Sequence, residues 1–353
     1  MKKNLINETS TLRDALGRLN KLSGSIMTLI AVDDELHMTG TLTDGDVRRA
    51  LLRGASLDSQ VKDVMHTAFH SLSAGDCDVA KIKQAREKGI ELLPVLDKEG
   101  RIERLLEISG RRTFLPLQAV LMAGGRGERL RPLTDTLPKP LLPINGKAII
   151  DYNIESLADA GISDITVATR YLADKMAEHF STPVAGVKVN CVVENEPLGT
   201  IGALSLVDRK NPDGFTLVMN SDLLTTVSFE EMYLTHMEHK ADITVGVIPY
   251  TLSVPYAILQ TEGTDVKGIS EKPTYTYYAN AGIYIISNRL LDNITTGARI
   301  DATDFIESAI KQGDTVTYYP INGTWIDVGT PADFAQAQEL MRHLRNFQNQ
   351  DNK

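Results

Sequence analysis

Residues 123–144 read AGGRGERLRPLTDTLPKPLLPI and follow directly on the apolar run Gln118–Met122, which has the pattern of a buried strand. Glycines allow a backbone to turn tightly and to bring its N–H groups close to an anion, and cationic side chains add charge to such a turn. The glycines and cations of this stretch are Gly124, Gly125, Gly127, Arg126, Arg129, Arg131 and Lys139. A glycine turn and four cations after a strand predict a triphosphate site.

Two familiar phosphate motifs do not fit this stretch. A P-loop requires GxxxxGK followed by Ser or Thr, whereas Lys139 lies far beyond the turn, between two prolines. A dinucleotide fingerprint requires a third Gly or Ala, but Leu130 follows Gly125 and Gly127 at that place. The stretch therefore predicts a different kind of nucleotide site.

Composition is that of a folded protein of more than one domain. The chain has 353 residues, of which 42% are hydrophobic and 24% charged, so two or three domains are expected. The net charge of -9 argues against sequence-independent binding of nucleic acid, and a nucleotide site must then be basic only locally.

The sequence predicts a cytoplasmic protein. Cys77 and Cys191 lie 114 positions apart in what are expected to be different domains, which argues against a disulfide framework and favours a reducing compartment. No apolar stretch follows the two N-terminal lysines, and no run approaches the roughly 18 apolar residues of a membrane span. We therefore expect neither an export signal nor a membrane segment.

The first 114 residues contain a pattern that nearly recurs. An offset of 63 places Val32 on Val95 and Asp34 on Asp97, and each unit has the order helix, strand, acidic turn, strand. The first unit continues through GTLTDGD, residues 40–46, to VKDVM, residues 61–65. On these motifs, residues 1–114 resemble a tandem CBS (cystathionine beta-synthase type) domain of α+β structure.

The CBS resemblance implies an adenine nucleotide as a further partner. Thr43 and Asp46 match the residues that hold phosphate and ribose, whereas the second repeat has Leu106 and Ser109 there, so one competent site is expected. Two roles stay open for this segment, one regulatory and the other structural or oligomerising. In the second, Asp46 serves only to cap the following helix.

A different architecture follows the short stretch RRTFLP, residues 111–116, which is predicted to be a linker. From Leu117 onward, strand-like runs alternate with helical stretches such as AIIDYNIESLADAG, residues 148–161. This alternation indicates βαβ units and a mainly parallel sheet, in which ligands lie beyond the carboxyl ends of the strands. The catalytic domain is expected to span 117–345, with a polar tail at 346–353.

Five motifs occur in order along this second segment: AGGRGERLRPLT with PKPLLPI, ENEPLGTIGAL, MNSDLL, EKP followed by NAGIYI, and WIDVGTP. On these motifs the chain resembles the sugar-1-phosphate nucleotidyltransferases. The resemblance implies a Rossmann-like, mixed but mainly parallel sheet of the glycosyltransferase-A kind. It also implies transfer of a nucleotidyl group from an NTP to a sugar 1-phosphate, with release of pyrophosphate.

The resemblance also assigns roles to individual residues. Arg129 and Lys139 match the catalytic cations, and Asp222 and Asp327 match the ligands of Mg²⁺. The residues that match nucleotide contacts are Ala123, Gly124, Gly125, Gly127, Glu128, Glu196, Gly199 and Thr200. Those that match the sugar-phosphate side are Glu271, Lys272, Asn280 and Gly282. Glu128 departs from the family, which often has Thr at that place.

GTP is the expected donor, because LRPLTDTLPKPLLPINGK is most similar to mannose-1-phosphate guanylyltransferases and their relatives for heptose or amino-sugar phosphates. Uridylyl and thymidylyl transferases share the same catalytic residues, and silent regulatory subunits share the fold, so both alternatives stay open. The resemblance also implies a homo-oligomer. His236 and His239 share a helix face without a third ligand nearby, so we expect a solvated face rather than a zinc site.

Overall fold

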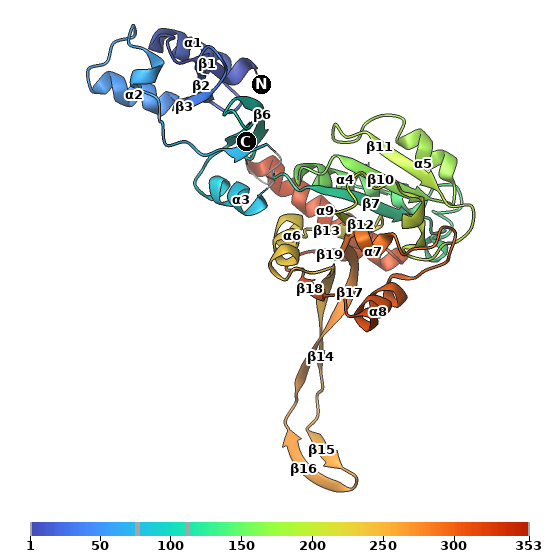
Figure 1. The fold of residues 1–353 in the computed structure, drawn as a ribbon. Helices are drawn as coiled ribbons and strands as arrows, with labels where there is room; N and C mark the ends of the chain where they lie inside the picture. Colours follow the sequence, from blue (N-terminus) through green and yellow to red (C-terminus); the bar gives the residue numbers. More distant parts are fainter. Residues whose placement is uncertain (1, 75–77, 110–112, 352–353) are drawn as a thin grey trace. The chain divides into compact units, whose positions relative to one another are not determined.

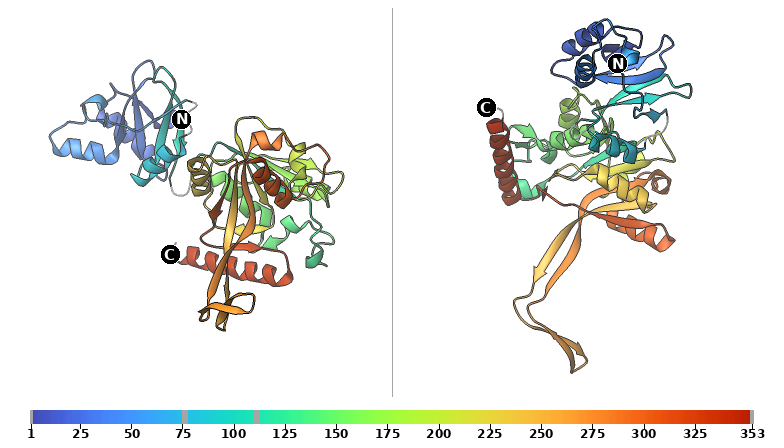
Figure 2. Two further views of the ribbon diagram at one scale, coloured as in Figure 1. Left: turned by 60° about the horizontal axis from the view of Figure 1, so that its bottom comes forward. Right: turned by 90° about the vertical axis from the view of Figure 1, so that its left-hand side faces the viewer.

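The computed structural model describes residues 2–74, 78–109 and 113–351, without the side chains of residue 2 and of residues 344–351. The chain divides into two compact units, Met1–Leu115 and Pro116–Lys353 (Figures 1 and 2). Cys77 lies outside the described residues, as do Arg111 and Arg112 of the predicted linker. Within the described ranges, no helix has the length and apolar character needed to cross a membrane.

Unit 1 consists of two three-stranded sheets, β1-β2-β3 and β4-β5-β6, each with one parallel and one antiparallel pairing. Its elements are η1 (Lys2–Asn4), β1 (Leu5–Asn7), α1 (Leu12–Lys21), β2 (Thr28–Val32), β3 (Met38–Thr43), α2 (Asp44–Leu52), η2 (Val61–Asp63), β4 (Leu72–Ser73), α3 (Val79–Glu87), β5 (Leu92–Leu96) and β6 (Ile102–Glu107).

The internal repeat is confirmed, but its offset is 64 rather than 63. Asp33 accepts hydrogen bonds from the N–H groups of residues two and four positions later, and Asp97 does the same. The β-bulges match at the same spacing, because the register shifts after Ala31 in one hairpin and after Val95 in the other. Thr43 therefore corresponds to Glu107, and the counterpart of Asp46, residue 110, lies outside the described residues.

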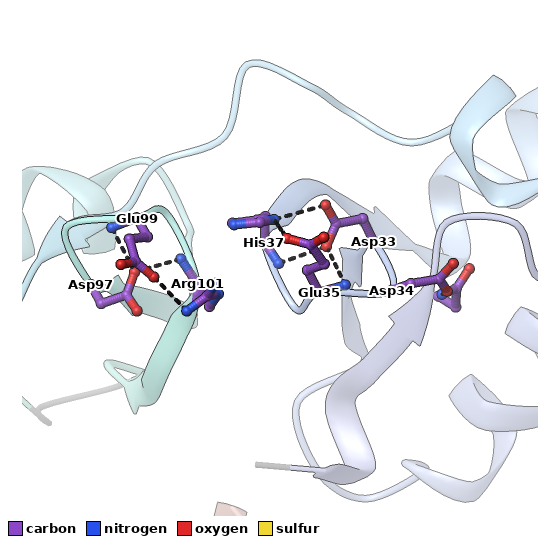
Figure 3. Close-up of polar contacts among 8 residues, drawn as sticks. Asp33, Asp34, Glu35, His37, Asp97, Glu99 and Arg101 are labelled. Carbon is purple, nitrogen blue, oxygen red and sulfur yellow. Dashed lines mark hydrogen bonds and ion pairs between the residues drawn. The ribbon is translucent and has the colours of Figure 1, made fainter.

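The two acidic turns, drawn in Figure 3, come from the two halves of unit 1, and main-chain contacts between them join these halves. An isolated antiparallel β-bridge pairs the backbones of His37 and Arg101, and the carbonyl of Gly100 accepts a hydrogen bond of 3.1 Å from the N–H of Met38. Apolar side chains from both sheets pack behind this contact, among them Ile30 and Leu92. The repeat therefore folds as one body with a shared core.

The predicted linker is partly wrong. Thr113 and Leu115 are buried, and Phe114 packs against the core of the second repeat, below the guanidinium of Arg104 at 4.7 Å. Removing these apolar side chains from water against the neighbouring core is favourable in free energy, so the segment packs on the core instead of forming a solvent-exposed linker.

Unit 2 is built on a seven-stranded sheet of order β11-β10-β7-β12-β17-β14-β18. Its elements are β7 (Leu117–Ala123), η3 (Glu128–Leu130), η4 (Lys139–Leu141), β8 (Pro143–Ile144), β9 (Lys147–Ala148), α4 (Ile149–Asp159), β10 (Asp164–Thr169), α5 (Ala173–His179), β11 (Val189–Val193), η5 (Gly202–Leu206), β12 (Phe215–Asn220), β13 (Leu223–Thr225), α6 (Phe229–Glu238), β14 (Ile243–Ser253), β15 (Ile258–Glu262), β16 (Asp265–Ser270), β17 (Thr274–Ser287), α7 (Asn288–Leu291), α8 (Ala302–Gln312), β18 (Val316–Pro320), β19 (Trp325–Asp327) and α9 (Pro331–Asp351).

The sheet is mixed and mainly parallel, as predicted. β11, β10, β7 and β12 run parallel, β17 is antiparallel to its two neighbours, and β18 is parallel to β14. Val120 and Val218 are paired in register and form part of a core that includes Ala302 and Ala309 of α8. The residues predicted as a tail from 346 continue helix α9 as far as Asp351.

The prediction of a solvated face at His236 is wrong. One face of α6 packs on the sheet, so His236 is only 1% exposed, its ring meets that of Phe215 edge-on at 4.6 Å, and its Nδ1 lies 2.7 Å from Thr244 Oγ1. Burial lowers the pKa of His236 from 6.5 to about 4, against a smaller opposing effect of Asp242. His239, the C-cap residue of the same helix, is exposed.

We predict an acid-sensitive unfolding of unit 2. The unfolded chain takes up a proton at His236 below about pH 6.5, whereas the folded protein keeps it neutral to about 4, so stability is lost as the pH falls through this window. Between about pH 7.5 and 5 the unfolding free energy should drop by about 2 kcal/mol from this group. Fluorescence of Trp325, the only tryptophan of the chain, reports on this unit. His236→Gln should remove this pH dependence of the unfolding free energy, and His239→Gln should keep it. An equal change of the unfolding free energy with pH in both variants and the wild type would contradict the assignment of this effect to His236.

Candidate active site

The candidate site lies at the carboxyl ends of two neighbouring parallel strands. Asn220, the last residue of β12, is paired with Met122 of β7. The chain then continues into the glycine turn from β7 and into Asp222 from β12. Ser221 fixes this edge, because its buried hydroxyl donates a hydrogen bond of 2.7 Å to the carbonyl of Met122. Sequence reasoning did not single out Ser221.

The glycine turn packs against the stem of Lys139. Gly127 has a φ of +63°, and a Cβ there would lie 3.0 Å from both Lys139 Cβ and Thr134 Cγ2. The buried Thr134 hydroxyl donates to the carbonyl of Gly127 at 2.9 Å. The glycine is therefore required both for its conformation and for this close approach.

Lys139 lies between the two predicted metal ligands. Its Nζ forms an ion pair with Asp222 Oδ2 and lies 3.5 Å from Asp327 Oδ1, while the residue is only 8% exposed. The carboxylates meet because β13 is antiparallel to β19, with Leu223 opposite Asp327. Residues 105 positions apart are thus brought to one ammonium group, that of Lys139.

Arg129 joins the same cluster from η3. Its guanidinium lies over Gly329, where an added Cβ would be 2.8 Å from one terminal nitrogen. Burial raises the pKa of Asp327, and the positive charge of Arg129 acts against that increase. The other arginines of the turn have different partners: Arg131 pairs with Asp135 at 3.3 Å, and Arg126 lies 5.9 Å from the ring of Tyr171. Lys139 therefore contacts both carboxylates, and Arg129 lies beside Asp327 at Gly329.

The two carboxylates suit a divalent cation. Burial and the neighbouring charge of Asp222 raise the pKa of Asp327 above its ordinary value. Asp327 Oδ1 is shielded from solvent, and no donor among the described residues satisfies its hydrogen-bond geometry. Such a pair of oxygen ligands fits Mg²⁺, which takes one or two carboxylates together with substrate phosphates and water. The described residues contain no group of three or more candidate ligands.

Glu194 is a buried carboxylate that sequence reasoning missed. It lies at the end of β11, where its Oε2 accepts a hydrogen bond of 3.2 Å from the N–H of Leu198, and burial raises its pKa. A Cβ on Gly124 would come within 2.6 Å of its Oε1. Glu194 therefore links the glycine turn to the ENEPLG loop, whereas the predicted Glu196 is exposed. Its position directly after an apolar strand was the available signal.

Gly199 and Thr200 join the loop to α8. The Thr200 hydroxyl accepts a 2.7 Å hydrogen bond from the N–H of Ala302, and its own N–H donates to Asp301 Oδ1. Gly199 has a φ of +81°, and a Cβ there would be 2.4 Å from the carbonyl oxygen of Ile300. Their contacts within the chain are therefore structural ones. The remaining predicted nucleotide residues lie in or beside the turn: Ala123, the last residue of β7, is buried, whereas Gly125 and Glu128, the first residue of η3, are exposed.

Gly199→Ala is expected to lower the stability of unit 2 by about 3 kcal/mol or more, because it adds a backbone clash to an unfavourable φ. Gly186→Ala is the matched control: its φ is +77° but nothing lies within 4 Å, so it should cost only about 1 kcal/mol of strain. Chemical denaturation followed by Trp325 fluorescence measures both. Equal losses in the two variants would show that the contact with Ile300 is unimportant.

The predicted sugar-side residues are split between two places. Gly282, with a φ of +71°, lies against the amide of Asn220, and Asn280 accepts a 2.9 Å hydrogen bond from the N–H of Gly282. Glu271 and Lys272 instead lie beyond the outer end of β17, and both are exposed. The structure thus brings Asn280 and Gly282 to the edge of the site and leaves Glu271 and Lys272 away from it.

Unit 1 contains a separate cavity of about 240 Å³. Thr43 lines it, whereas Asp46 does not. Asp46 accepts hydrogen bonds from the N–H and the hydroxyl of Thr43, completing a capping box at the start of α2. The other lining residues are Thr28, Thr41, His66, Ala68, Phe69, His70, Gly89, Ile90, Glu91 and Leu92.

Fold and site together define a mixed α/β protein with a cluster of cations and carboxylates beyond the carboxyl ends of its parallel strands. The family model "Nucleotidyl transferase" matches residues 118–343, and the chain therefore belongs to the nucleotidyl transferase family.

Relatives support the same family. The chain is 34% identical over 228 residues to the mannose-1-phosphate guanyltransferase of Yarrowia lipolytica, covering 62% of each chain. It is 28% identical over 229 residues to the D-glycero-alpha-D-manno-heptose 1-phosphate guanylyltransferase of Aneurinibacillus thermoaerophilus, covering 64% of this chain and 99% of the relative. The chain spans 61–64% of the mannose-1-phosphate guanyltransferases that it matches.

Solved structures show the same fold. HddC from Yersinia pseudotuberculosis is 25% identical to this chain, with a TM-score of 0.51, over 64% of this chain and 99% of HddC. A second structure of HddC, complexed with GMP-PN, is 24% identical with the same TM-score and coverage.

Proposed function

We propose that the chain transfers a nucleotidyl group, guanylyl in particular, from an NTP to a sugar 1-phosphate. Placement of Lys139 between Asp222 and Asp327, with Arg129 beside them, carries this proposal. Two cations and two carboxylates lie where the strand ends meet a glycine turn, as a site for a triphosphate requires.

In the proposed reaction an oxygen of the sugar phosphate attacks the α-phosphorus of the NTP. The bond from the α-phosphorus to the oxygen that bridges it to the β-phosphorus breaks, and pyrophosphate leaves. Because an anion attacks an anionic centre, the protein must supply charge and alignment, with little need for a general base. Arg129 is suited to neutralise the leaving pyrophosphate, and Lys139 to bridge the reacting phosphates.

Mg²⁺ is the proposed cofactor, with Asp222 and Asp327 as its protein ligands. When bound, the ion would neutralise phosphate charge and help to orient the triphosphate. Substrate phosphates would then compete with the carboxylates for Lys139, whose Nζ is held by both in the structure.

The guanine preference rests on the relatives, which are named guanylyl- or guanyltransferases. Uridylyl or thymidylyl transfer is the alternative within the class, since every residue of the cluster serves those reactions equally. A silent binding subunit is the alternative outside it. The joint presence of Arg129, Lys139, Asp222 and Asp327 in one cluster argues against that second alternative, because a silent copy has no need for all four.

A pyrophosphate-release assay tests the activity. Purified full-length chain is incubated with Mg²⁺, each of GTP, UTP, dTTP and ATP, and a panel of sugar 1-phosphates that includes mannose and heptose phosphates. Turnover is expected with GTP in preference to the other three. Preference for UTP or dTTP would overturn the guanylyl assignment, and no turnover with any pair would favour the silent subunit.

We further propose that unit 1 is a tandem CBS pair that binds an adenine nucleotide in its cavity. The repeat at offset 64, the joined acidic turns and the presence of Thr43 in the cavity wall support this. His66 and His70 would face the phosphates, while Phe69 and Ile90 offer apolar contact to the base. Asp46 would act by orienting Thr43.

Thermal unfolding with AMP, ADP and ATP tests this second proposal. A ligand at about 100 times its Kd should stabilise unit 1 by about 2.7 kcal/mol. Phe69→Ser should abolish the shift, and Phe114→Ser is the control, because Phe114 lies outside the cavity lining. Failure of all three nucleotides to raise the Tm or to alter turnover would leave unit 1 with a structural or oligomerising role.

A further inference from the structure

A long arm leaves the central sheet of unit 2. It comprises residues 249–278: the outer parts of β14 and β17, paired as far as Ser253 and Thr274, and the terminal hairpin of β15 and β16. Figures 1 and 2 show this ribbon extending away from the sheet, with β15 and β16 at its end. All five residues of β14 from Pro249 to Ser253 are exposed, so neither face of the ribbon is covered.

The arm displays an unusual amount of apolar surface. Nine large side chains on it are 40–74% exposed: Tyr250, Leu252, Tyr256, Leu259, Val266, Ile269, Tyr275, Tyr277 and Tyr278. At about 200 Å² for a tyrosine, the five tyrosines alone present on the order of 500 Å². With the aliphatic side chains, the total over both faces of the ribbon approaches the roughly 800 Å² that each partner contributes to a standard interface.

The arm also carries half of the sugar-side residues. Glu271 and Lys272 lie between β16 and β17, and Lys272 adopts a left-handed φ of 44°, which is unfavourable for a lysine. Thr274, the first residue of β17, is eight positions from Gly282 along an extended strand, roughly 26 Å at about 3.3 Å per residue. No lysine side chain spans that distance, so within one chain Lys272 does not reach the edge marked by Gly282 and Asn220.

A second copy of the chain accounts for both the exposed apolar surface of the arm and the distance of Lys272 from its own site, with the arm kept in its extended conformation. The ladder between β14 and β17 is continuous from Val247 to Ser253, so folding the arm back over its own sheet would break paired backbone. A two-fold axis beside the arm lets each copy lend its arm to the other and cover the same apolar surface on both.

Resting on the proposed function, we propose that two copies of this chain associate through their arms, so that Glu271 and Lys272 of each complete the sugar-phosphate side of the other's active site. The carboxylate would accept hydrogen bonds from sugar hydroxyls, and the ammonium would bind the sugar phosphate.

Mixing two defective full-length variants tests the exchange. Lys139→Met removes a core cation, and Glu271→Gln with Lys272→Met disables the arm. In a mixed dimer, the core of the arm variant receives the intact arm of the other chain, so an equimolar, re-equilibrated mixture should recover about a quarter of wild-type activity. Lys139→Met mixed with Asp222→Asn is the matched control, because both lesions lie in the core and no mixed dimer gains an intact site.

Mass measurement by light scattering gives a readout independent of catalysis. Tyr250 and Tyr277 lie opposite each other on the ribbon. Their joint replacement by Ser should weaken the dimer at least about 100-fold. Met237→Ser, an exposed apolar residue on α6, should not.

The outcomes separate the two hypotheses. If the wild-type protein is active but the mixture of the two variants recovers no activity, the arm exchange is overturned and the proposed function is retained. A wild-type protein without turnover contradicts the proposed function, and light scattering then tests the association alone. A monomeric wild type would overturn the arm exchange. A dimer that the joint replacement of Tyr250 and Tyr277 does not weaken would overturn it as well.

Discussion

Lys139→Met should lower kcat/KM about 10³-fold, equivalent to about 4 kcal/mol of lost transition-state stabilisation. Lys139 is the buried cation at the centre of the candidate site, held by Asp222 and lying 3.5 Å from Asp327 Oδ1. Methionine keeps most of the apolar stem that packs under Gly127 and removes only the charge. Steady-state pyrophosphate release with the preferred NTP measures the effect.

Lys147→Met is the control for this experiment. Lys147 also forms an ion pair, with Glu155, and contacts the ring of Tyr152 at 3.8 Å, but it lies outside the candidate site. Its replacement should change kcat/KM by less than about twofold, because a partly exposed pair contributes little. A Lys139→Met enzyme within a few fold of wild type, with an unchanged Trp325 emission, would remove Lys139 from the catalytic machinery.

Asp222→Asn should lower kcat by about 100-fold or more and raise the Mg²⁺ concentration needed for half-maximal activity. Asp222 and Asp327 are the two carboxylates available to the ion, and the substitution removes one negative charge while keeping the size of the side chain. EDTA should abolish wild-type turnover, and excess Mg²⁺ should restore it.

Asp213→Asn provides the comparison. Asp213 precedes β12 at the opposite end of the strand from Asp222 and is exposed. It should leave both kcat and the Mg²⁺ dependence unchanged. If Asp222→Asn kept the wild-type Mg²⁺ dependence, the metal would have to be held by other groups.

Much of the site could be predicted from sequence, because its residues follow strand ends. In a parallel sheet the carboxyl ends of neighbouring strands lie at the same edge. A polar residue directly after an apolar run, such as Asp222, is therefore expected at that edge. Glu194 obeys the same rule but was not predicted, because the motif resemblance placed the nucleotide contacts in the loop that follows it. The repeat in unit 1 was recognised, but its offset was wrong by one residue, because turns that share an Asp can be aligned on either of two neighbouring acidic positions.

Other errors came from tertiary packing. His236 looked like a solvated histidine because helical spacing shows which residues share a face but not whether that face packs on the sheet. Phe114 looked like part of a linker because a short basic stretch ending in proline carries no sign of the open core beside it.

By itself, the sequence determined the order of the elements, the mainly parallel sheet, the glycine turn and the identity of the charged groups, since these follow from local patterns of glycine, charge and apolar spacing. Only the tertiary structure decided that Asp327 meets Asp222 through the pairing of β13 with β19, and that Glu271 and Lys272 lie on an arm away from the edge marked by Gly282. The reason is physical: which distant segments meet is set by long-range strand pairing and burial, and these depend on the whole chain rather than on any stretch of it.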